Sequence, residues 1–111
     1  MPPKTLAEYQ QMFRSIYPPD GRSIEHAGVH LAEEIGEFSE AIMKYRGTHN
    51  QKDFEELRSE AADIFSCVIG LFNSMNASIA DELAGMFGEN CHVCHAAPCQ
   101  CTFEFVTKFN S

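Results

Sequence analysis

Acidic side chains recur at one spacing in the middle of the sequence. Glu34 and Glu37 are three residues apart, and Glu60 and Asp63 repeat that spacing. Side chains three residues apart share one face of a helix. Four carboxylates brought together repel one another, and a hard divalent cation with oxygen ligands removes that repulsion. The pattern predicts a Mg²⁺ or Mn²⁺ site, with a solvated acidic helix surface as the simpler alternative.

A second cluster of possible metal ligands lies near the end of the sequence. Its members are Cys91, Cys94, Cys99 and Cys101. Four thiols at such short spacings are typical of a closed, tetrahedral Zn²⁺ site. We therefore expect a structural zinc knuckle. His92 and His95 are alternative ligands, and disulfides or free thiols are the competing interpretations.

The elements that must position these residues are helices. Capping residues and helix breakers divide the chain into four helical segments. With their N-caps included, the expected helices cover residues 5–17, 23–46, 51–75 and 78–88. Thr5 and Glu8 form a capping box at the first start, Ser23 caps the second helix, and Gly47 is expected to end it.

Apolar residues recur every three or four positions along the two long helices. The stripe on the second helix is Ile24, Gly28, Leu31, Ile35, Phe38, Ile42 and Tyr45; that on the third is Phe54, Leu57, Ala61, Ile64, Val68, Leu71 and Met75. The four acids lie along one flank of these stripes, so antiparallel packing would bring them together. We predict an all-α fold, a small four-helix bundle with a short C-terminal cysteine-rich metal knuckle.

Length and charge limit the possible functions. The 111 residues fit one domain, with the bundle at about 5–88, the knuckle at about 89–102 and a strand-like tail at 103–111. The formal net charge of −8 argues against binding to polymeric nucleic acid or to a membrane surface. No apolar run is long enough to cross a bilayer, and the N-terminus does not look like a secretion signal. We expect a cytoplasmic protein whose thiols are reduced.

Two segments of the sequence resemble a known family. They are LAEEIGEFSEAI at residues 31–42 and EAADI at residues 60–64. Together they are similar to the MazG-like all-α nucleoside triphosphate pyrophosphohydrolases, whose hallmark is ExxE on one helix and ExxD on the next. The resemblance covers roughly residues 6–90 and implies the all-α NTP pyrophosphatase type of bundle.

The resemblance implies hydrolysis of (d)NTPs to (d)NMP and pyrophosphate, usually as nucleotide-pool housecleaning. It further implies Mg²⁺ bound by the four acids, a metal-activated water that attacks the α-phosphorus, and assembly as homodimers or homotetramers. The catalytic and metal-binding residues would be Glu34, Glu37, Glu60 and Asp63. The substrate would be a nucleoside triphosphate. We expect the first helix and the loop 17–23 to recognise its base through Phe13 or Tyr17, although a place in the core is the simpler interpretation of either aromatic.

The cations that should bind the phosphates are largely missing from this chain. Asn90 matches an Asn of the family, but Met86 replaces the expected Lys, and no Lys or Arg lies between Glu60 and Thr107. Lys44 and His30, on the flank that carries the acids, are the expected substrate-binding residues, although a solvated Lys and a structural His are the simpler interpretations. The remaining candidates are Arg46, Lys52, Arg58 and groups of a neighbouring subunit.

This shortage of cations supports a second hypothesis. The chain could be a non-catalytic, zinc-stabilised, oligomeric binding module that retains the acids but has lost its phosphate contacts. The intact set of four acids favours the enzyme.

Overall fold

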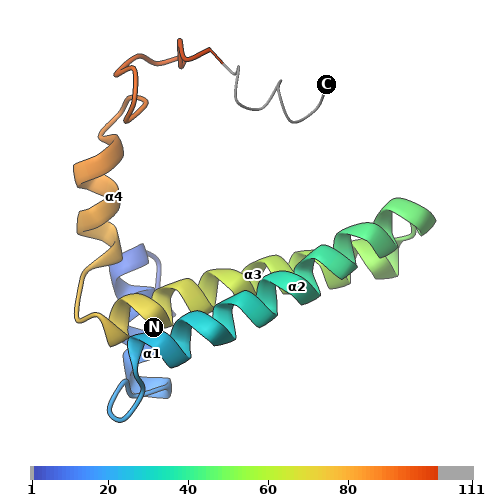
Figure 1. The fold of residues 1–111 in the computed structure, drawn as a ribbon, viewed down its shortest axis with the longest axis horizontal. Helices are drawn as coiled ribbons and strands as arrows, with labels where there is room; N and C mark the ends of the chain where they lie inside the picture. Colours follow the sequence, from blue (N-terminus) through green and yellow to red (C-terminus); the bar gives the residue numbers. More distant parts are fainter. Residues whose placement is uncertain (1, 103–111) are drawn as a thin grey trace. The chain divides into compact units, whose positions relative to one another are not determined.

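The computed structural model describes residues 2–102, and the regular secondary structure of these residues is all α-helical. Its helices are α1 (Leu6–Ile16), α2 (Ile24–Thr48), α3 (Gln51–Ser74) and α4 (Ile79–Phe87), as Figure 1 shows. The predicted all-helical fold with four helices and a C-terminal cysteine cluster is confirmed. The predicted strand-like tail lies outside the described residues. No single helix in the described part combines the length and apolar composition of a membrane span.

The chain divides into two compact units, Met1–Ile79 and Ala80–Ser111. The first contains α1, α2 and α3, and the second contains most of α4 and the cysteine cluster. The predicted single domain and its internal boundaries stay a prediction.

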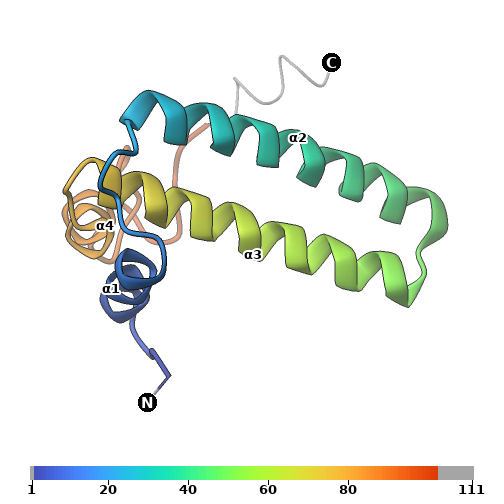
Figure 2. The same ribbon diagram turned by 90° about the horizontal axis from the view of Figure 1, so that it is seen from below.

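Helices α2 and α3 form a long antiparallel pair (Figure 2), because only His49 and Asn50 separate them. The Asn50 side chain starts α3 by accepting a hydrogen bond from the backbone N–H of Asp53 at 2.8 Å. The predicted end of α2 at Gly47 was wrong, since the helix continues to Thr48. His49 adopts the left-handed conformation instead, with φ 53°. Its backbone N–H donates to the Tyr45 carbonyl at 2.7 Å.

Helix α1 is attached to the far end of this pair by one buried amide. The Gln10 side chain donates to the Asn73 side chain at 2.9 Å and to the Ala77 carbonyl at 2.7 Å, and it accepts from the backbone N–H of Ile79 at 3.0 Å. Gln10 and Asn73 are both buried. At the start of α1, the predicted capping residue Thr5 accepts from the Glu8 N–H.

The hydrophobic core of the single chain is small. The buried apolar residues are Ala27, Ala41, Ile69 and Ile79. Ile69, which is 1% exposed, does not belong to the predicted stripe of α3. On α2 the stripe residues Ile24, Ile35 and Ile42 remain 41–48% exposed. The two alanines therefore allow α2 and α3 to approach, while part of the predicted apolar stripe stays accessible on the outside.

Candidate active site

The antiparallel arrangement of α2 and α3 brings the predicted acids together. Carboxylate oxygens of Glu34 and Glu37 on α2 and of Glu60 on α3 all lie within 4.8 Å of one another. Asp63, one turn beyond Glu60, interacts directly with Glu34 through its side chain. Glu34, Glu37 and Glu60 thus share one site between the two helices, and Asp63 adjoins that site at Glu34. Their role as metal ligands stays a prediction.

The electrostatics of this site are unfavourable without a cation. Interaction with Asp63, partial burial and the charge of Glu37 raise the pKa of Glu34. Burial, followed by the charges of Glu37 and Asp63, raises the pKa of Glu60.

One oxygen of each of these two residues is also buried without a hydrogen-bond partner among the described residues. These oxygens are Glu34 Oε2 and Glu60 Oε2. A buried acceptor without a partner destabilises the fold, and a buried negative charge does so more strongly. A hard divalent cation would satisfy both oxygens and screen the repulsion between the acids, so the residues present fit Mg²⁺ or Mn²⁺.

A pocket of about 350 Å³ adjoins the acids. Asp63 belongs to both the acid site and the pocket wall. The pocket wall also includes Phe13 and Tyr17, whose rings stack with centroids 6.4 Å apart and planes 15° apart. Phe13 or Tyr17 was predicted to stack on the nucleotide base, and that contact stays a prediction. The pocket therefore combines an apolar, aromatic side with a carboxylate side.

One arginine and two histidines also line this pocket: Arg22, His26 and His30. His30 lies one turn before Glu34, with Nε2 3.9 Å from Glu34 Oε1, so it joins the pocket to the acid site. Sequence reasoning missed Arg22. The signal was present, because Arg22 is the sole Lys or Arg in the loop 17–23, which was expected to contribute to base recognition.

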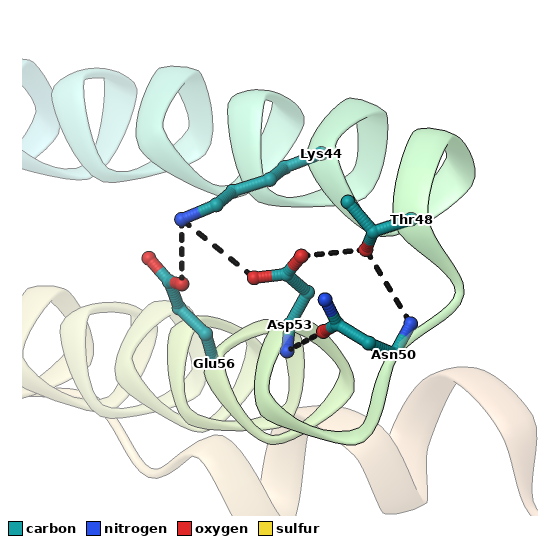
Figure 3. Close-up of polar contacts among 5 residues, drawn as sticks. All are labelled: Lys44, Thr48, Asn50, Asp53 and Glu56. Atoms are coloured by element: carbon teal, nitrogen blue, oxygen red, sulfur yellow. Dashed lines mark hydrogen bonds and ion pairs between the residues drawn. The ribbon is translucent and has the colours of Figure 1, made fainter.

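Lys44, the other predicted substrate-binding residue, already has two carboxylate partners (Figure 3). Its Nζ lies 3.3 Å from Glu56 Oε2 and 3.6 Å from Asp53 Oδ1. The Glu56 carboxylate and, to a smaller extent, the Asp53 carboxylate raise the pKa of Lys44. These contacts join α2 to α3 near the turn between them. Phosphate binding by Lys44 stays a prediction, now in competition with these ion pairs.

Asp53 is the centre of this network. It is 4% exposed, and its carboxylate accepts a hydrogen bond from the Thr48 hydroxyl. That bond, followed by the charge of Lys44, lowers the pKa of Asp53. The network therefore holds a buried, ionised carboxylate at the end of the hairpin.

The remaining predicted residues belong to the second unit. Asn90 follows α4, and its backbone N–H donates to the Phe87 carbonyl at 2.8 Å. Its predicted contact with phosphate stays a prediction. The four cysteines gather in one cluster, with their Sγ atoms within 4.8 Å of one another. Backbone N–H groups of Gln100 and Ala96 lower the pKa of Cys94 to about 6.

Comparison with known families agrees with the geometry of the acid site. The family model of the MazG nucleotide pyrophosphohydrolase domain matches residues 22–92, well over half of the chain. This range contains all four acids of the site, together with Arg22 and His30. Comparison with curated proteins and with solved structures gave no match.

Proposed function

We propose that this chain, which belongs to the family of MazG nucleotide pyrophosphohydrolase domains, hydrolyses (d)NTPs to (d)NMP and pyrophosphate with Mg²⁺ or Mn²⁺, as nucleotide-pool housecleaning. The observation that carries this proposal is the convergence of Glu34, Glu37 and Glu60, with Asp63 beside Glu34. Glu34 and Glu60 each have a buried oxygen without a hydrogen-bond partner. A divalent cation would satisfy these oxygens, because none of the described residues donates a hydrogen bond to them.

In this proposal Glu34, Glu37, Glu60 and Asp63 hold the divalent cation. When bound, the cation supplies Lewis acidity, an activated water and charge neutralisation for the polyphosphate. The four carboxylates would fix its position from two helices, and the bound cation would attract the phosphates, which the carboxylates alone would repel. Because the net charge of the chain is −8, the cation is also the main attraction for a polyanionic substrate.

The adjoining pocket suits the nucleoside. The stacked rings of Phe13 and Tyr17 offer an aromatic surface of the kind on which a base stacks. Arg22 supplies a permanent positive charge on the wall of the same pocket, and guanidinium groups bind phosphate oxygens in a bidentate manner. We therefore assign to Arg22 part of the phosphate binding that the chain lacks elsewhere. His30, between the pocket and Glu34, would add a hydrogen-bond donor.

The chain would act as a homodimer or homotetramer. Ile24, Ile35 and Ile42 follow one another at spacings of eleven and seven residues, so they form a line along α2, and all three are more than 40% exposed. The same line of isoleucines on a second copy of the chain could pack against it, which would bury both lines in a symmetric interface. Replacement of Ile35 and Ile42 by Asp should dissociate the oligomer in sedimentation experiments. A wild-type chain that is monomeric at micromolar concentration would overturn this part of the proposal.

Pyrophosphate release tests the activity. The wild-type protein should release pyrophosphate from at least one member of a (d)NTP panel in the presence of Mg²⁺, and Glu37→Gln and Glu60→Gln should abolish the release. Glu33→Gln and Glu40→Gln are matched controls, because both acids are exposed on the same helix as Glu37 and lie outside the acid site. Equal turnover by all four variants would overturn the assignment of the site.

The shortage of cations supports one other function. No Lys or Arg lies between Glu60 and Thr107. A non-catalytic, zinc-stabilised binding module would not need phosphate-binding cations in this segment. Such a module would bind Mg²⁺ and nucleotide through the same acids without hydrolysis. The same panel separates the two functions: product formation supports the enzyme, and nucleotide binding without product supports the module.

A further inference from the structure

The four cysteine sulfurs of the second unit all lie within 4.8 Å of one another. Cys91 Sγ lies 3.7 Å from Cys101 Sγ, and Cys94 Sγ lies 3.8 Å from Cys99 Sγ. A disulfide would require sulfurs about 2.05 Å apart. A tetrahedral Zn²⁺ with Zn–S bonds of about 2.3 Å separates its sulfur ligands by about 3.8 Å. The observed separations match the second arrangement.

We propose that Cys91, Cys94, Cys99 and Cys101 bind one Zn²⁺ in a closed, four-thiolate structural site. This site is separate from the acid site in its ligands, its metal and its unit of the chain. Zinc binding displaces the thiol protons and involves no oxidation. The proposal therefore does not depend on the proposed hydrolysis.

The backbone around the cluster is arranged to support thiolate ligands. Backbone N–H groups point at three of the sulfurs: Val93 N–H at Cys91, Gln100 N–H at Cys94 and Cys101 N–H at Cys99, over distances of 3.2–3.4 Å. Donors of this kind stabilise negative charge on sulfur and orient the ligand. Each donor lies two or six positions after its cysteine in the sequence, so the fold of the loop itself supplies these donors.

The turn between the two cysteine pairs is closed by its own backbone. The His95 N–H donates to the Cys91 carbonyl at 2.9 Å, and the Cys91 N–H donates to the Ala96 carbonyl at 3.1 Å. His95 adopts a positive φ of 59°, which lets the chain reverse direction directly after Cys94. This reversal returns the chain toward Cys91, so that Cys99 and Cys101 meet the first pair.

The structure also narrows the choice of ligands that the sequence left open. The converging donor atoms belong to the four cysteines, and neither histidine joins them. The His92 ring packs edge-on against Phe87, with ring centroids 5.0 Å apart. His92 is therefore occupied by an aromatic contact within the second unit, and the ligand set consists of sulfur alone.

A metal is needed here because the second unit has little else to hold it. None of the residues 80–102 is buried. Without an apolar core, a segment of this length does not hold one conformation unless a disulfide or a metal fixes it. Zinc would therefore stabilise the knuckle itself, whereas the hairpin of α2 and α3 is stabilised by its own contacts.

Metal analysis of the full-length chain tests the proposal. Protein purified under reducing conditions from zinc-supplemented cells should contain one zinc per chain by elemental analysis. Cobalt substitution should give the visible absorption of tetrahedral Co²⁺ and a thiolate-to-cobalt charge-transfer band. Cys94→Ser and Cys101→Ser should lose the zinc and the cobalt bands. His92→Ala, Cys67→Ser and Glu60→Gln, which change the neighbouring ring, the thiol outside the cluster and the acid site, should retain both.

Circular dichroism shows whether a variant that has lost zinc is still folded. The Cys→Ser variants should keep the helical signal, because the long helices lie in the first unit. Several results would overturn the proposal: a wild-type chain without zinc, one that carries iron, disulfides detected among these cysteines by mass spectrometry under the same reducing conditions, or loss of zinc in His92→Ala.

Discussion

Asp63 on α3 interacts with the carboxyl group of Glu34 on α2, and this contact is the largest cause of the raised pKa of Glu34. Two acids from different helices are thus held against each other where either could have been solvated. The charge of Glu37 also raises the pKa of Glu34, and burial, followed by the charges of Glu37 and Asp63, raises the pKa of Glu60. This arrangement makes the stability of the metal-free protein depend on pH and on cations.

The first prediction concerns that pH dependence. The folded-state pKa values of Glu34 and Glu60 lie above the ordinary 4.5. The folded state therefore binds more protons than the unfolded state in this range, and the free energy of unfolding contributed by these groups falls as pH rises from 4.5 through the raised pKa values.

In Mg²⁺-free buffer at neutral pH, Glu60→Gln should raise the melting temperature. The gain should shrink as the pH approaches 4, and saturating Mg²⁺ should reverse it, because only the wild type gains from the cation. A gain that is the same at pH 4 and pH 7 would contradict this account.

Arg22 provides a prediction about substrate binding. A charge-assisted hydrogen bond contributes about 1.5–3 kcal/mol, so Arg22→Ala should lower kcat/KM about 10- to 100-fold, mainly through KM. Arg22→Lys should recover part of the loss, because it keeps the charge but not the bidentate geometry. Arg14→Ala is the control, since Arg14 lies on α1 outside this pocket. An unchanged KM in Arg22→Ala would remove Arg22 from the binding site.

A Lys44 variant tests whether this side chain stabilises the fold or binds the substrate. If its main role is the pairing with Asp53 and Glu56, Lys44→Met should lower the melting temperature and leave KM for nucleotide unchanged. The loss should be smaller at high salt, which screens exposed ion pairs. A raised KM with unchanged stability would instead support the phosphate contact that the sequence predicts.

Gln10 provides a prediction about the fold alone. Gln10→Leu leaves the Asn73 side chain and the Ile79 N–H without their partner, and a buried group without a partner costs about 1–3 kcal/mol. Urea denaturation should show a loss of this size. Gln11→Leu, at the exposed neighbouring position, should change stability by less than about 0.5 kcal/mol. Equal losses in the two variants would show that the amide network does not attach α1.

Much of the first unit could be predicted from local sequence. Thr5 and Ser23 cap helices because their side-chain oxygens accept N–H groups that no helical turn can satisfy. The acids could be predicted to meet, because the helical period places each pair on one face and a two-residue connection forces antiparallel packing.

Contacts between distant segments could not be predicted in this way. Lys44 pairs with Asp53 because α2 runs past Gly47 before it turns, and that extension shifts the register of the two helices. Ile69 is buried although it is off the predicted stripe, because burial on α3 also depends on where α1 crosses, as Gln10 and Asn73 show. The position of Arg22 in the pocket wall depends on the path of a loop, and the periodicity of the sequence gives no information about that path.

Binding of Mn²⁺, followed by electron paramagnetic resonance, tests the central claim most directly. The wild-type chain should bind Mn²⁺ at a saturable site that Mg²⁺ displaces, and Glu34→Gln, Glu37→Gln and Glu60→Gln should each weaken binding at least tenfold, while the exposed control Glu33→Gln leaves it unchanged. Equal Mn²⁺ affinity in the wild type and the three site variants would contradict the claim that these acids hold one cation together.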